Sequence, residues 1–88
     1  MKTQFEASFK RDLKKLKDAK LKSKIKAVIL ECKAAPSLTA IANLKKLKGY
    51  DNFYRIRVGN HRLGITVFGD ELKFVRCLQR KDIYRFFP

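Results

Sequence analysis

The chain has 88 residues and a formal net charge of +14 at pH 7, so it is long enough for one domain, residues 1–88, and its charge favours a polyanionic partner. Two cysteines and one histidine exclude a secreted disulfide framework and argue against a zinc site. No signal peptide and no apolar run of membrane-spanning length is present. We therefore expect a cytoplasmic protein with reduced cysteines, no metal, no small-molecule cofactor and no membrane partner.

The positive charges are sorted along the chain. Nearly all of the lysines precede residue 49, and nearly all of the arginines follow residue 54. Lysine is a flexible point charge, whereas the planar fork of arginine matches the geometry of a phosphate group. The lysines of the first part are therefore expected to attract a polyanion without regard to its geometry. The arginines of the second part are expected to recognise the geometry of individual phosphate groups.

The first half of the chain predicts one strand followed by a helical hairpin. Residues 1–7 alternate weakly between apolar and polar, which indicates a short strand. Residues 9–16 place their apolar side chains on one helical stripe, with Ser8 as the N-cap. A second helix is predicted over Lys20–Ala34, where apolar residues recur at helical spacing and Cys32 is a core thiol.

Residues 37–49 predict either a short helix or a turn-rich connector ahead of the sheet. Three lysines, Lys45, Lys46 and Lys48, form a basic cluster in this segment. Such a cluster is either a solvated surface or a contact with nucleic acid, and the sequence leaves both interpretations open.

The next segment, Phe53–Phe68, predicts a hairpin that turns at Gly59-Asn60. Its residues alternate with period two, and a two-residue loop fixes the pairing of the two strands. In that register Arg57 lies opposite Arg62, and Arg55 lies opposite Gly64, which leaves open space. The apolar face then carries Tyr54, Ile56, Val58, Leu63 and Ile65. The opposite face, here called the arginine face, carries Arg55, Arg57 and Arg62.

The arginine face predicts an anion site. Like charges placed directly opposite one another destabilise a sheet, so a chain that keeps three arginines there is expected to bind a phosphate. The simpler alternative is a solvated basic surface without a ligand. The prediction depends on the turn, because a slip of one residue would move the arginines to the other face.

A second hairpin is predicted to turn at Gly69-Asp70 and to lead into a short C-terminal helix. The same pairing geometry places Val67 opposite Leu72, Ile65 opposite Phe74, Gly64 opposite Val75 and Arg62 opposite Cys77. Cys77 and Gln79 then fall on the arginine face, Arg80 follows at the end of the strand, and the helix folds Tyr84 back over the arginines. A thiol at Cys77 is either a small buried strand residue or a group acidified by the nearby cations.

These elements predict an α+β domain with the order β-α-α-β-β-β and a short C-terminal helix. The sheet has about four strands, mostly antiparallel, and packs on the two-helix hairpin. The helices cover one face of the sheet, and the arginines assign the other face to function.

Metal-independent RNA cleavage is the chemistry that these residues allow. No Ser-His-Asp, Cys-His or paired-carboxylate arrangement is visible, and His61 is interpreted as a turn residue. A 2′-hydroxyl can attack the adjacent phosphodiester if the protein supplies a proton acceptor, cationic stabilisation of the phosphorane and help for the leaving oxygen. Arginines provide the stabilisation, and a tyrosine among them is a candidate proton acceptor.

Three motifs, LKKLKG, YRIRVGNHRLGI and RKDIYR, resemble those of the RelE/ParE superfamily of toxins from type II toxin–antitoxin systems. The resemblance covers nearly the whole chain and implies the RelE-like fold. RelE-type members are ribosome-dependent endoribonucleases that cut mRNA in the decoding site, whereas ParE-type members poison DNA gyrase. The resemblance favours RelE-type mRNA cleavage, with a gyrase poison or a catalytically inactive binding relative as the alternatives.

The resemblance also implies roles for individual residues. It implies that the arginines hold phosphate or stabilise the transition state and that Tyr84 stacks on or activates the substrate nucleotide. The expected catalytic residues are Arg55, Arg57, Arg62, Arg80 and Tyr84, and the expected RNA-binding residues are Lys45, Lys46, Lys48, Gln79 and Lys81. Many relatives carry Gly-His where this chain has Leu78-Gln79, and a glutamine cannot act as an acid or base.

The expected partners follow from the charge and the resemblance together. An antitoxin with an acidic, amphipathic segment is expected to fold onto this chain. The ribosome and its mRNA are the other expected partners, and binding to them should depend steeply on salt.

Overall fold

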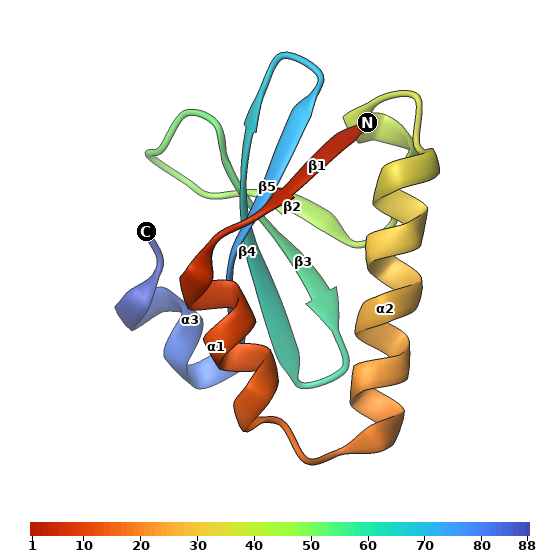
Figure 1. The fold of residues 1–88 in the computed structure, drawn as a ribbon. Coiled ribbons are helices and arrows are strands. Elements are labelled where there is room, and N and C mark those ends of the chain that lie inside the picture. Colours follow the sequence, from red (N-terminus) through yellow and green to blue (C-terminus); the bar gives the residue numbers. More distant parts are fainter.

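The computed structural model describes residues 1–88, which form three α-helices and a five-stranded sheet (Figure 1). The elements in chain order are β1 (Lys2–Phe5), α1 (Ala7–Lys15), α2 (Ala19–Ala34), a 3-10 turn (Leu38–Ala40), β2 (Leu44–Lys46), β3 (Phe53–Val58), β4 (His61–Phe68), β5 (Glu71–Gln79) and α3 (Arg80–Phe86). None of the helices combines the length and apolar character needed to cross a bilayer.

The strands lie in the order β1-β5-β4-β3-β2. β1 runs parallel to β5, and every other neighbouring pair is antiparallel. The predicted α+β class is confirmed, but the sheet has five strands rather than about four. The additional strand is β2, which is only three residues long and pairs with β3 so that Lys45 lies opposite Arg55.

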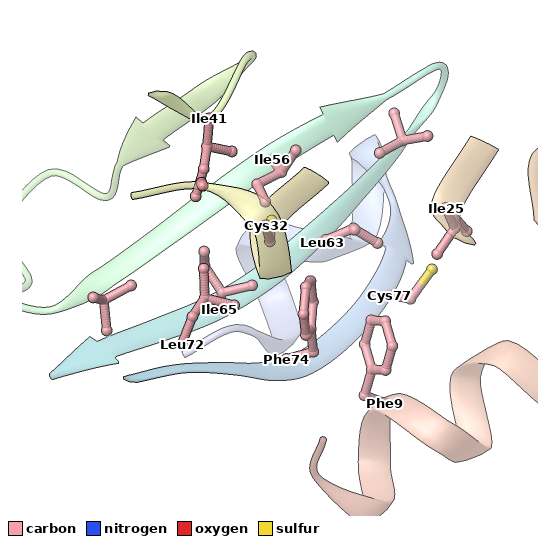
Figure 2. Close-up of a cluster of buried hydrophobic side chains, with 13 residues drawn as sticks. Phe9, Ile25, Cys32, Ile41, Ile56, Leu63, Ile65, Leu72, Phe74 and Cys77 are labelled. Atoms are coloured by element: carbon pink, nitrogen blue, oxygen red, sulfur yellow. The ribbon is translucent and has the colours of Figure 1, made fainter. Parts of the chain in front are cut away.

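Helices α1 and α2 cover one face of the sheet and form the predicted hairpin, α1 descending and α2 rising in Figure 1. Phe9 of α1, and Ile25 and Cys32 of α2, are buried against the strands. Figure 2 shows these side chains meeting those of β3, β4 and β5 in one cluster. The predicted apolar face is confirmed, since Ile56, Val58, Leu63 and Ile65 are buried and Tyr54 is partly buried.

The two helices begin differently from the prediction. Helix α1 begins at Ala7 after Glu6, so Ser8 is not its N-cap; instead the Ser8 hydroxyl donates a hydrogen bond to the Val75 carbonyl oxygen on β5. Helix α2 is capped by Asp18, whose carboxylate accepts from the Leu21 N–H at 3.1 Å.

The first hairpin has the predicted register. Arg57 lies opposite Arg62, and Arg55 lies opposite Gly64. Gly59 begins the turn with a φ of 59°, in the left-handed region that glycine adopts without strain. The three arginines of this hairpin therefore share one face of the sheet.

The second hairpin departs from the prediction at a β-bulge. Val67 lies opposite Leu72 and Ile65 opposite Phe74, as predicted, but the register then shifts between Gly64 and Ile65. Gly64 consequently faces Arg76, Leu63 faces Cys77 and Arg62 faces Leu78. The predicted pairs of Gly64 with Val75 and of Arg62 with Cys77 are wrong, because the bulge inserts one extra residue into β5.

Helix α1 satisfies the polar groups that the bulge releases. The Asp12 carboxylate accepts a hydrogen bond from the backbone N–H of Cys77 at 2.9 Å. It also accepts two bonds from the Arg76 guanidinium, at 2.8 and 3.2 Å. Together with the bond from Ser8 to Val75, these contacts fix α1 to the bulge.

Helix α3 packs on the arginine face of the sheet, opposite to α1 and α2. Its Ile83 and the following Phe87 are buried with Leu47. The Phe87 ring lies directly over Gly64, where a Cβ atom would come within 2.7 Å of it. The open space predicted beside Arg55 is therefore filled by the C-terminal aromatic residue.

Candidate nucleic-acid interface

The part of the arginine face that α3 leaves open gathers cations from three elements. Arg55 and Arg57 come from β3, Arg62 from β4 and Arg80 from the start of α3. The backbone N–H of Arg80 donates to the Asn60 carbonyl oxygen at 2.9 Å, which fixes the start of α3 against the turn of the first hairpin.

Tyr84 lies over this group of arginines, as predicted. The guanidinium carbon of Arg55 is 5.6 Å from the centre of the Tyr84 ring, a cation–π distance. Tyr84 is nevertheless 60% exposed. Its ring is therefore positioned by Arg55 and still available to a ligand.

Arg62 lies at the centre of the cluster and is only 7% exposed. Its Nη1 donates to the carbonyl oxygens of Gly59 and His61, at 3.1 and 2.9 Å, but its buried Nε has no partner. Burial lowers the pKa of Arg62, and the positive charges of Arg55 and Arg80 lower it further. The positive charge of Arg62 is therefore not balanced by a neighbouring negative charge.

No acidic side chain neutralises the cluster. The ion pairs of the protein join Lys46 to Asp51, Lys73 to Glu6, and Arg76 to Asp12. None of these ion pairs includes Arg55, Arg57, Arg62 or Arg80. The positive charge of these four arginines is therefore available to an external anion.

A pocket of about 300 Å³ opens on the β2 side of Arg62. Arg55, Arg57 and Arg62 line it together with Lys45 and Asn43. Asn43 was not expected in the site. Its carbonyl oxygen accepts from the Arg57 backbone N–H at 3.2 Å, and its side chain accepts from the Arg57 Nη2 at 3.4 Å. The only signal in the sequence is that asparagine tolerates the left-handed conformation, which it adopts here with a φ of 61°.

A second pocket, of about 440 Å³, opens on the α3 side of the cluster. Asn60, Arg80, Lys81 and Tyr84 line it. The structure therefore brings Lys81 together with Arg80 and Tyr84. Lys48 is exposed and lies with Tyr84 along a neighbouring pocket at the end of the chain.

Two of the expected RNA-binding residues do not join the arginine face. Lys46 lies opposite Tyr54, on the other side of the strand from Lys45, and pairs with Asp51 at 3.4 Å. Gln79 lies opposite His61 on the face that α1 and α2 cover, because the bulge shifts the end of β5. Its predicted place beside the arginines is wrong.

The bulge also removes Cys77 from the arginine face. The side chain is buried in the main core, and burial raises the pKa of its thiol to about 12. The alternative of a cation-activated thiolate is therefore wrong. His61 is half-buried, and burial lowers its pKa below the usual value.

The arrangement can bind phosphates and stabilise negative charge that develops on them. It presents three partly or fully exposed guanidinium groups around one buried arginine, and guanidinium groups form strong, charge-assisted hydrogen bonds to phosphate oxygens. Tyr84 is the group with a hydroxyl that these cations surround. No cluster of three His, Cys, Asp or Glu side chains that could hold a metal ion is present in the chain.

Comparison with known proteins identifies the family. The family described as "ParE toxin of type II toxin-antitoxin system, parDE" matches residues 4–84. "Toxin RelE3" of Methanocaldococcus jannaschii is 47% identical over the full length of both chains. The crystal structure of the RelB-RelE antitoxin-toxin complex from Methanococcus jannaschii matches with a TM-score of 0.82 and 46% identity, covering 97% of this chain and 99% of that one.

A bacterial structure agrees with these archaeal relatives. The YoeB/ParE toxin from Agrobacterium tumefaciens matches with a TM-score of 0.69 and 25% identity, over 91% of this chain and 99% of that one. The predicted resemblance is thereby confirmed. The chain belongs to the RelE/ParE superfamily of toxins from type II toxin–antitoxin systems, and it is a toxin of the RelE family.

Proposed function

We propose that this toxin is a ribosome-dependent, metal-independent endoribonuclease that cuts mRNA. The observation that carries the proposal is Arg62, a buried arginine with an unpartnered Nε and no acidic neighbour, surrounded by the other cations of the cluster. A phosphodiester approaching its transition state carries extra negative charge, which this arrangement is suited to stabilise.

In the proposed reaction the 2′-oxygen of one nucleotide attacks the adjacent phosphorus, and its proton passes to the oxygen of Tyr84, which acts as a phenolate. The bond from phosphorus to the 5′-oxygen breaks, and the leaving oxygen takes up a proton from water. The hydroxide formed in this way removes the proton from Tyr84 and restores the phenolate. The products are a 2′,3′-cyclic phosphate and a 5′-hydroxyl. Arg62 and Arg80 stabilise the phosphorane, and Arg55 holds the Tyr84 ring in place.

The test is cleavage of mRNA on programmed ribosomes, mapped by primer extension. We expect Arg80→Ala and Tyr84→Phe to cut far more slowly than the wild type. Arg11→Ala is the matched control, because Arg11 is an exposed arginine of α1 outside the cluster, and it should cut at the wild-type rate. Equal rates for all four proteins would contradict the proposed site.

Inhibition of DNA gyrase is the second candidate function. It is favoured by the position of Gln79, which replaces the histidine of many relatives and also lies away from the arginines. Tyr84 is then the single candidate proton acceptor. A supercoiling assay run in parallel separates the two functions, since gyrase inhibition without mRNA cleavage would make this chain a ParE-type poison.

An antitoxin is the proposed protein partner, in line with the RelB-RelE complex of the archaeal relative. A pocket of about 390 Å³ between α1 and α2 has an apolar floor and a lysine rim, which suits an acidic, amphipathic segment. Its lining residues are Leu13, Lys14, Lys22, Ile25, Lys26 and Ile29.

The partner to test is any small acidic protein that is encoded beside this toxin. We expect Ile29→Asp to weaken its binding by about tenfold or more, because it places a charge on the apolar floor. Leu30→Asp is the control, since Leu30 is the neighbouring, exposed residue outside the pocket. Circular dichroism would confirm that both variants fold, and unchanged affinity of a folded Ile29→Asp would contradict this surface.

A further inference from the structure

A third pocket adjoins the arginine face, between the turn that follows β2 and the end of the chain. Its volume is about 400 Å³. Leu47 and Phe87 contribute apolar surface, Tyr50 and Tyr84 contribute aromatic rings, and Lys48 and Arg85 contribute positive charge. None of these residues except Lys48 and Tyr84 was expected to contact RNA.

Tyr50 is a large aromatic residue that the fold holds in place and leaves open. It is 51% exposed. Its ring packs against Phe53 at 6.0 Å between centres, and Phe53 packs in turn against the buried Phe87 at 5.6 Å. The Tyr50 N–H also donates to the Leu47 carbonyl oxygen at 3.3 Å. An aromatic ring supported on one side and exposed on the other is suited to stacking.

The charged residues around the pocket are positive and favour an anionic ligand. Lys48 and Arg85 take part in no ion pair, and no acidic residue lines the pocket. The acidic neighbour of Tyr50, Asp51, is paired with Lys46. Aromatic rings beside free cations are the combination with which proteins bind single-stranded nucleic acid, because bases stack on the rings while the cations contact the backbone.

The pocket also adjoins the proposed cleavage site. Tyr84 lines both this pocket and the one that holds Arg80 and Lys81. We propose that the pocket binds the base of a nucleotide next to the scissile phosphate, with Tyr50 as the stacking side chain and Lys48 and Arg85 as contacts to the flanking phosphates. This inference rests on the proposed function in taking single-stranded RNA as the ligand.

The test measures binding of free RNA, without cleavage. Fluorescence anisotropy would follow a short, labelled, 2′-O-methylated RNA, which cannot be cut, and a series of the same RNA with one abasic position moved along the chain. For the wild type we expect one abasic position to weaken binding by about tenfold, since stacking of one base contributes on that scale.

Tyr50→Ala should bind the complete RNA about tenfold more weakly and should no longer respond to that abasic position. Tyr50→Phe should keep both properties, because stacking needs the ring and not the hydroxyl. Phe68→Ala is the matched control, since Phe68 is an aromatic residue 62% exposed at the turn between β4 and β5, and it should behave as the wild type.

Three results would overturn the inference: wild-type affinity in Tyr50→Ala, an abasic penalty that persists in Tyr50→Ala, or no measurable RNA binding by the wild type. Ribosomal cleavage is measured separately, so the two proposals can fail independently. Binding that depends on Tyr50 without any cleavage would support the pocket and remove the nuclease. If Tyr50→Ala cut mRNA at the wild-type rate, the nuclease would be supported and the role of the pocket in RNA binding would be rejected.

Discussion

Arg62 and Arg76 lie on neighbouring strands, β4 and β5, in opposite electrostatic settings. Arg76 reaches Asp12 of α1, and the two hydrogen bonds between them raise its pKa. Arg62 is more deeply buried, has no carboxylate near it and has a lowered pKa. The protein thus pairs one arginine with a carboxylate and leaves the other without one. The first stabilises the fold, and the second is the arginine to which we assign the proposed function.

Replacement of Arg62 should have the largest effect, and it should fall on activity. We expect Arg62→Met to reduce the rate of mRNA cleavage by about 100-fold or more, because it removes a preorganised positive charge from the transition state. The free energy of unfolding should not decrease, since the change removes an uncompensated buried cation from beside Arg55 and Arg80. Single-turnover cleavage and urea unfolding measure the two quantities, and a loss of stability with normal cleavage would reverse the assignment.

Disruption of the Asp12–Arg76 pair should show the opposite behaviour. We expect Asp12→Ala to lower the free energy of unfolding by about 3 kcal/mol, because it leaves Arg76 unpaired and the buried Cys77 N–H without an acceptor. The double variant Asp12→Ala/Arg76→Met should recover part of this loss. Asp18→Asn is the control, since asparagine caps a helix as well as aspartate does. Urea unfolding would contradict the prediction if Asp12→Ala lost less than about 1 kcal/mol.

A change at the contact between Gly64 and Phe87 should have a smaller effect, and it tests how the end of the chain packs on the arginine face. We expect Gly64→Ala to lower the free energy of unfolding by about 1–3 kcal/mol, because the new Cβ overlaps the Phe87 ring. The cost should shrink when Phe87→Ala is already present. A double-mutant cycle measures this coupling. Equal costs of Gly64→Ala in both backgrounds would show that the ring moves aside freely.

The smallest effect concerns the core cysteines at alkaline pH. Burial raises the pKa of Cys32 to about 11 and of Cys77 to about 12, from an ordinary value of 9.0. Between pH 9 and 11 the unfolded chain therefore loses thiol protons that the folded chain keeps, so the unfolded state binds fewer protons and stability falls as pH rises. Between pH 8 and pH 10 the wild type should lose about 1 kcal/mol more than Cys77→Ala. Denaturant titrations at both pH values measure this difference. If the wild type and Cys77→Ala lost the same free energy of unfolding between pH 8 and pH 10, a raised pKa at Cys77 would be contradicted.

Local patterns were sufficient to predict the first hairpin and its arginine face. Alternation over Phe53–Phe68 and a two-residue turn determine which side chains share a face, and the structure has that register. The fold class, the two helices and the position of Tyr84 over the cluster follow from similarly local signals.

The bulge in β5 was not predictable in the same way, because its stabilising contacts are distant in sequence. Ser8 and Asp12 of α1 bind the polar groups that the extra residue releases, and nothing within β5 itself signals them. Cys77 and Gln79 were predicted on the wrong face of the sheet because the extra residue of the bulge shifts the rest of β5 by one position. Strand β2 was missed because three residues carry too little alternation, and its pairing with β3 defines it.

The parallel pairing of β1 with β5 joins the first strand of the chain to the last one. During synthesis β1 has no partner until residues 71–79 have emerged, and Arg80 and Tyr84 follow later still. A nascent chain without these residues therefore has neither the complete five-stranded sheet nor the complete cationic cluster. A chain that stops before residue 80 is therefore expected to lack the mRNA cleavage proposed above and to be a ready substrate for proteases.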